Sequence, residues 1–130
     1  MGIEKDIENS IISYIRMNGW YCQKVHSGSL FKQGKDIMYK IKLADEGTPD
    51  ILSSINGKFI GIEIKKDQKE IERGDRVVER FIKKGKYPKS NHREVMQHLE
   101  AVKILKAGGI VLTVSSITQL VDDLKELKII

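Results

Sequence analysis

Three charged residues near the middle of the chain have types and spacing that suit chemistry on a phosphate. The stretch GTPDILSSINGKFIGIEIKK holds Asp50 directly after Pro49, and Glu63 and Lys65 two positions apart. Two carboxylates can hold Mg²⁺ or Mn²⁺ through their oxygens, and such a metal makes a bound water more acidic and neutralises charge that develops at phosphorus. A neighbouring ammonium group can orient the attacking water. These residues therefore favour metal-dependent hydrolysis of a phosphodiester.

A β-hairpin is predicted to bring the three residues together. The segments 50–55 and 58–64 are rich in isoleucine and are separated by Asn56 and Gly57. Asn-Gly is the strongest short hairpin signal, because both residues of the turn need a positive φ. The end of the second strand should therefore return to the start of the first, where Asp50 lies.

Alternation along the second strand places its two charged residues on one face. Side chains of a strand point to opposite faces in turn, so Glu63 and Lys65 share a face while Ile62 and Ile64 face the other way. The alternative is a solvent-facing ion pair on an edge strand, which a Glu-x-Lys pair alone does not exclude. A Pro-Asp pair, a hairpin and then this pair form a rarer combination, which favours an active site.

Periodicity and turn signals predict the remaining elements. The predicted helices run from Ile3 to a cap at Gly19, over 67–84, over 95–107, and from a cap at Ser115 or Ser116 to Leu127. The predicted strands are 20–25, 37–43, 50–55, 58–64 and 110–114, the last being an apolar run typical of a central strand, while 26–36 and 83–93 are predicted loops. The order α-β-β-β-β-α-α-β-α indicates an α/β fold with a mixed central sheet flanked by helices.

Size and composition fit one compact domain. The chain has 130 residues, of which 40% are hydrophobic, enough for a single core. Cys22 is the only cysteine, so no internal disulfide can form, and its apolar neighbours predict a place in the core. The first residues lack the apolar run of a signal peptide, and no segment approaches the length of a membrane span. We therefore expect a soluble, cytoplasmic protein.

The positive charge of the chain is concentrated in one segment. The net charge is +5, and residues 65–93 hold eleven lysines and arginines against five acidic residues, while the rest of the chain is nearly neutral. Such a local surplus fits contacts with a nucleic-acid backbone. The predicted DNA-binding residues in this segment are Lys83, Lys84, Lys86 and Lys89. The alternative is a solvated helix with internal ion pairs between residues four apart.

Several motifs follow one another in a set order along the chain. They are an acidic first helix, KVHSG, GTPDIL, NGKFIGIEIKK, Gln97 in a late helix, and LKAGGIVLTVSS before the last helix. With this set the chain resembles the VRR-NUC branch of the PD-(D/E)xK nucleases and, more distantly, the archaeal Holliday-junction resolvases. The resemblance covers nearly the whole chain except about 67–93. It implies a single nuclease domain over 1–130, a restriction-endonuclease-like core and a basic insertion at 67–93.

The resemblance also implies roles for the central residues. Asp50 and Glu63 would bind Mg²⁺ or Mn²⁺ together with the backbone carbonyl of Ile64, and Lys65 would be the catalytic lysine. Gln97 matches a late-helix glutamine that contacts the substrate or a water, although a plain surface glutamine is the alternative.

The first helix supplies a further acidic ligand in this family. Glu4 and Glu8 lie one turn apart on the same side of that helix. The distance from Glu8 to Gly19 matches the resolvase pattern, so Glu8 is our predicted metal ligand, whereas VRR-NUC spacing favours Glu4. Ser27 matches a loop near the site in relatives, so it is a predicted DNA contact. The three histidines lack metal-ligand spacing and are interpreted as surface residues.

The leading hypothesis is a divalent-metal endonuclease that acts on branched or structured DNA as a homodimer. The branched substrate and the dimer come from stand-alone relatives of the family, and a two-fold dimer would suit a two-fold junction. The alternatives are a restriction or repair nuclease that cuts linear duplex or flap DNA, and a non-catalytic DNA-binding module. The retained acidic residues and lysine argue against the last of these.

Overall fold

The computed structural model describes residues 2–26, 29–33, 38–42 and 44–130. The helices are α1 (Ile3–Met17), α2 (Gln68–Lys84), a short 3₁₀ helix η1 (Lys89–Asn91), α3 (His92–Lys106) and α4 (Ile117–Glu126). The strands are β1 (Tyr21–Lys24), β2 (Ser29–Gln33), β3 (Met38–Lys42), β4 (Ile51–Ile55), β5 (Lys58–Ile64) and β6 (Ile110–Val114). No helix within these residues has the length and apolar character needed to cross a membrane.

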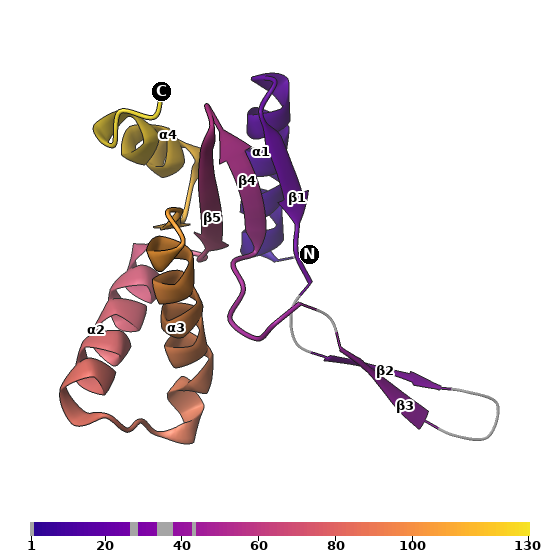
Figure 1. The fold of residues 1–130 in the computed structure, drawn as a ribbon, viewed down its shortest axis with the longest axis vertical. Coiled ribbons are helices and arrows are strands. Elements are labelled where there is room, and N and C mark those ends of the chain that lie inside the picture. Colours follow the sequence, from indigo (N-terminus) through magenta and orange to yellow (C-terminus); the bar gives the residue numbers. More distant parts are fainter. Residues whose placement is uncertain (1, 27–28, 34–37, 43) are drawn as a thin grey trace.

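Four of the strands form a mixed sheet in the order β1-β4-β5-β6. β4 pairs in antiparallel fashion with both β1 and β5, and β6 pairs in parallel with β5. This sheet and its flanking helices confirm the predicted α/β fold with a mixed sheet (Figure 1).

The prediction that β6 is a central strand is wrong, because β6 lies at the edge of this sheet. Its apolar run has a different cause, which is that helices cover both of its faces. Leu112 packs against the core on the side of α4, and Val111 and Thr113 face a cavity lined by α2 and α3.

The predicted loop over 26–36 contains a strand. β2 pairs with β3 in a separate two-stranded sheet, with Ser29 opposite Lys42 and Gln33 opposite Met38. Figure 1 shows this hairpin extending away from the four-stranded sheet. The mixed sheet therefore has four strands, because the predicted strand over 37–43 pairs outside it.

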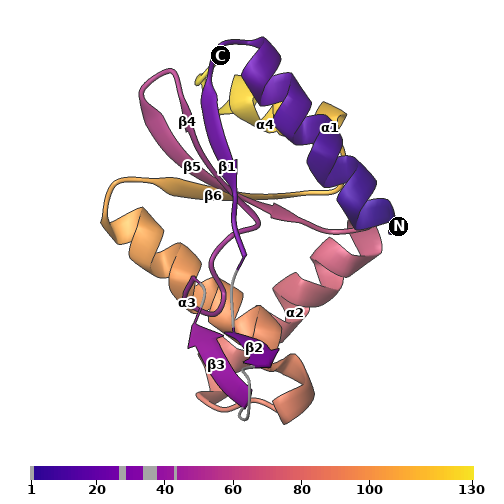
Figure 2. The same cartoon turned by 90° about the vertical axis from the view of Figure 1, so that its right-hand side faces the viewer.

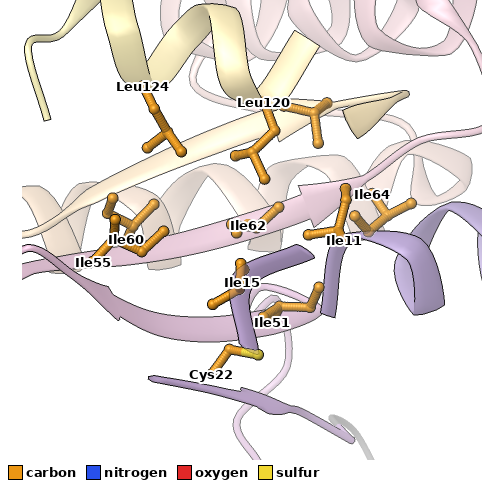
Figure 3. Close-up of a cluster of buried hydrophobic side chains, with 11 residues drawn as sticks. Ile11, Ile15, Cys22, Ile51, Ile55, Ile60, Ile62, Ile64, Leu120 and Leu124 are labelled. Atoms are coloured by element: carbon orange, nitrogen blue, oxygen red, sulfur yellow. The ribbon is translucent and has the colours of Figure 1, made fainter. Parts of the chain in front are cut away.

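One face of the sheet carries the main hydrophobic core. Alternate residues of β4 and β5 point toward α1 and α4, as Figure 3 shows. Cys22 is buried among them, as predicted. The buried residues of this cluster are Ile11, Ile15, Cys22, Ile51, Ile55, Ile60, Ile62, Ile64, Val114, Leu120 and Leu124. At about 25 cal/mol per Å² of apolar surface, burial of these side chains is the main force that holds the two helices on the sheet.

Helices α2 and α3 lie on the side of the sheet away from α1 and α4 (Figure 2). Asp67 caps α2 by accepting a hydrogen bond from the Glu70 backbone nitrogen at 2.9 Å, close to the predicted start. Helix α3 begins at His92, three residues before its predicted start, so the basic loop between the helices is shorter than expected. Asn91 precedes α3 and makes no side-chain capping bond.

Candidate active site

The β4–β5 hairpin brings Asp50 to the end of β5. Asn56 and Gly57 both have positive φ values, 50° and 81°, as the predicted tight turn requires. The register places Ile51 opposite Ile62, so Asp50 lies beside the last residues of β5. Its Oδ2 accepts a hydrogen bond of 2.8 Å from the Ile64 backbone nitrogen, which fixes the carboxylate at this end of the sheet.

Glu63 and Lys65 face away from the main core, toward α3. Glu63 is only 4% exposed, although it sits on the face opposite Ile62 and Ile64. Its Oε1 accepts a hydrogen bond of 3.1 Å from Nε2 of Gln97, and the Lys65 ammonium donates to Oε1 of the same glutamine at 3.0 Å. Gln97 therefore joins the buried carboxyl to the lysine, and all four predicted catalytic residues meet at one place.

The pKa of the Glu63 carboxyl lies far above the usual range for a glutamate. Burial is the main cause, and the negative charge of Asp50 and a hydrogen bond with its carboxylate add to it, so that the pKa of Glu63 rises to about 9. The positive charges of Lys65 and Arg93 pull the pKa down but do not offset these effects. Without a metal, the raised pKa therefore keeps the Glu63 carboxyl protonated at neutral pH.

The loop before Asp50 is packed on α3. Gly47 has a φ of 87°, and a Cβ built there would clash with the Met96 carbonyl on α3, so the loop can approach this closely only with glycine. Oε1 of Glu46 lies 3.0 Å from Nε2 of His92 at the start of α3. The loop and α3 thus hold Asp50 and Gln97 in a fixed relation.

Pro49 sets the other side of the same loop. It is fully buried, and a Cβ at Gly61 would lie 2.7 Å from its Cγ. The ring therefore fills the space that a side chain on β5 would take. This packing gives the Pro-Asp pair a structural reason, because the proline places the following Asp50 against the β5 backbone.

A cavity of about 370 Å³ opens beside the site, between α2, α3 and the sheet. Glu63, Lys65 and Gln97 line it together with Glu94, which is 7% exposed and lies 3.3 Å from the guanidinium of Arg73 on α2. Sequence reasoning missed Glu94 and its neighbour Arg93, whose charge acts on Glu63. Both fall in or beside the predicted basic loop, where no periodic pattern marks them.

Glu8 does not join Asp50 and Glu63 in the described residues. No group of three or more acidic, histidine or cysteine side chains suited to a metal is found there. Glu8 is largely buried, and its Oε1 lies 3.2 Å from the ammonium of Lys24, which sits beside Ile51 at the same end of the sheet. Glu4 is exposed to solvent.

The remaining predicted residues divide into two groups. Ser27 lies outside the described residues, so its predicted DNA contact has no structural counterpart. The basic residues are exposed at the far end of α2 and in the connection to α3, and these are Lys83, Lys84, Lys86 and Lys89. Arg73 on α2 pairs with Glu70 and Glu94.

Comparison with protein-family models, with curated proteins and with solved structures finds no match to this chain.

Replacing Glu63 with glutamine should stabilise the metal-free protein at pH 8. The folded pKa of Glu63 is about 9 against an ordinary 4.5, so between these values the folded state keeps a proton that the unfolded state has released. The free energy of unfolding then falls as pH rises through this window. Glutamine can accept from Gln97 and donate to Asp50 as the protonated acid does, without the pH-dependent cost.

We expect the variant to exceed the wild type by roughly 1–3 kcal/mol at pH 8 and by little near pH 4. Urea unfolding in EDTA at both pH values measures this difference. Asp122→Asn, an exposed carboxylate on α4, is the matched control and should show no such gain. Parallel pH profiles for wild type and Glu63→Gln would show that Glu63 titrates normally in the folded protein.

Proposed function

We propose that this chain is a Mg²⁺- or Mn²⁺-dependent endonuclease of the PD-(D/E)xK class, with a restriction-endonuclease-like core. The observation that carries the proposal is the buried Glu63, which lies beside Asp50 and is joined to Lys65 through Gln97. If Glu63 and Lys65 formed only a structural ion pair on an edge strand, the Glu63 carboxyl would be exposed to solvent, whereas it is buried and bonded to Gln97. Perturbed carboxyls grouped in a cavity are typical of functional sites.

The residues at the site fit a divalent cation. Mg²⁺ is usually held by one or two carboxylates and keeps several waters, so Asp50 and Glu63 suffice as side-chain ligands, with the Ile64 carbonyl as the backbone ligand that the resemblance implies. A bound cation supplies positive charge where the phosphate becomes more negative. It would also take the place of the proton that the raised pKa of Glu63 retains, so that metal binding would release a proton.

Lys65 and Gln97 are suited to act on the substrate. The Lys65 ammonium is only partly buried and is held by Gln97 at 3.0 Å, so its position is set before DNA arrives. It can donate to a phosphate oxygen or to the attacking water, and such a preorganised donor is worth about 10²–10³ in rate. Gln97 positions both Lys65 and Glu63 through its hydrogen bonds, and its amide lies close enough to Lys65 to contact the same substrate.

The proposed substrate is branched or structured DNA, cut by a homodimer. The family resemblance supports both parts of this proposal. The exposed lysines at the α2–α3 connection support DNA as the partner, because they add a cluster of positive charge on the helices that enclose the site.

Labelled four-way junction, flap, nicked and linear DNA of matched sequence test the activity directly. We expect cleavage with Mg²⁺ or Mn²⁺, none in EDTA, and the highest rate on the four-way junction. Equal rates on linear duplex would instead support a restriction or repair nuclease. Binding without cleavage of any of these DNAs, with either metal, would overturn the nuclease proposal and leave a DNA-binding module.

A further inference from the structure

A second cavity, of about 350 Å³, lies at the far end of α2, away from the sheet. Its size falls within the range of small-ligand sites, about 300–1,000 Å³. Phe81 and Tyr87 supply aromatic walls, and Arg80, Lys84 and Lys86 supply positive charge. Among the described residues that line this cavity none is acidic, which is unusual for a helix that carries both signs of charge elsewhere.

The local sequence builds the aromatic wall. Gly85 ends α2 in the left-handed conformation at φ 71°, and its backbone nitrogen donates to the Phe81 carbonyl at 2.8 Å. This tight turn folds the chain back, so that the Tyr87 ring meets the Phe81 ring edge to face, with centroids 5.5 Å apart. The hydroxyl of Tyr87 lies 2.9 Å from Nδ1 of His92, which fixes the ring. The wall is therefore formed before any ligand binds.

The histidine that holds Tyr87 also contacts the loop before Asp50. Nε2 of His92 lies 3.0 Å from Oε1 of Glu46 in that loop. Helix α2 contributes residues to the lining of both cavities, so the second cavity lies on one of the two helices that enclose the proposed active site.

We propose that this cavity binds one unpaired nucleotide of the DNA strand, a proposal that rests on the nuclease function above. The base would stack on the face of the Tyr87 ring, with the Phe81 ring standing nearly perpendicular beside it, and the flanking phosphates would contact Arg80, Lys84 and Lys86. Stacking requires a base whose face is free, as it is at a branch point, in a flap or in a flipped nucleotide. Aromatic side chains beside cations are the usual combination for single-stranded DNA, and they tolerate any base sequence.

An abasic scan tests the cavity with the wild-type protein. Binding is measured by fluorescence anisotropy in EDTA, so that no cleavage occurs, on duplexes with a short single-stranded overhang. Each overhang nucleotide is replaced in turn by an abasic residue that keeps the phosphate. We expect about a tenfold loss of affinity at one or two neighbouring positions and little change at the others. Contacts to phosphates alone would give a flat scan.

Three variants locate the effect. Tyr87→Ala should bind the parent oligonucleotide as weakly as the wild type binds the sensitive abasic one, and its own scan should be flat. Tyr87→Phe keeps the ring and should keep the sensitive position. Lys84→Gln should weaken binding to every oligonucleotide by the same factor. Because the wild-type scan needs no variant, misfolding of Tyr87→Ala would leave the main test intact.

The outcomes separate this proposal from the nuclease proposal. Cleavage of branched DNA together with a flat wild-type scan would overturn the nucleotide cavity and leave the active site standing. A sensitive position that Tyr87→Ala, folded by circular dichroism, does not abolish would also overturn it. If the wild type neither binds nor cleaves DNA, both proposals are overturned.

Discussion

Asp50→Asn should abolish metal-dependent cleavage while leaving the fold intact. Asparagine keeps the oxygen that accepts the 2.8 Å hydrogen bond from the Ile64 nitrogen, so the end of β5 stays in place. It removes the negative charge that a divalent cation needs, and the loss of metal-derived stabilisation should lower the single-turnover rate by about 10³-fold or more. Glu63→Gln should have the same effect, because it leaves the second carboxyl position permanently neutral.

Metal linkage gives an independent measurement on the same variants. A cation that binds only the folded state raises the midpoint of thermal unfolding. Mg²⁺ or Mn²⁺ should therefore stabilise the wild type and the control variant Asp122→Asn, and should have little effect on Asp50→Asn and Glu63→Gln. In EDTA, DNA binding should tighten in Asp50→Asn, since repulsion between carboxylate and phosphate falls. It should be unchanged in Glu63→Gln, because the raised pKa of Glu63 already keeps that carboxyl neutral without metal. Near wild-type cleavage by either variant would place the active site elsewhere.

The central hairpin and its site were predictable because their signals are local. Asn56 and Gly57 define the turn, and alternation along β5 places Glu63 and Lys65 together. With the turn fixed, the register follows, and Asp50 must lie beside Ile64. The motif resemblance singled out Gln97 but gave it a contact with substrate or water. Its hydrogen bonds to Glu63 and Lys65 were not predicted, because nothing local brings a residue of α3 to the end of β5.

The errors lie where placement depends on distant segments. The order of strands in a sheet cannot be read from local sequence patterns. A strand whose two faces are both covered by helices, such as β6, has an apolar sequence whether it lies at the edge or at the centre of the sheet. β2 was missed because its pairing partner is another short strand and Gly28 and Gly34 flank it, which are loop signals. The burial of Glu94 is likewise caused by α2 and the sheet. Nothing in the local sequence indicates that this charged residue is buried.

Lys65→Ala should lower the single-turnover cleavage rate by about 10²- to 10³-fold without loss of metal affinity. The Lys65 ammonium is held by Gln97 at the site but is not a metal ligand. Its positive charge near Glu63 would repel Mg²⁺ or Mn²⁺. Its removal should therefore leave the metal-induced rise in thermal midpoint unchanged or larger. Single-turnover rates at saturating enzyme and a Mg²⁺ titration of thermal stability measure the two effects separately.

The chain provides a matched control in the next residue. Lys66 is also a lysine but is exposed, in the bend between β5 and α2. Lys66→Ala should therefore cleave at close to the wild-type rate once DNA is saturated, although it removes the same charge. Equal losses in the two variants would mean that Lys65 contributes only general attraction to DNA. Lost metal binding in Lys65→Ala would instead mean that Lys65 maintains the arrangement of Glu63 and Gln97 rather than acting on the phosphate.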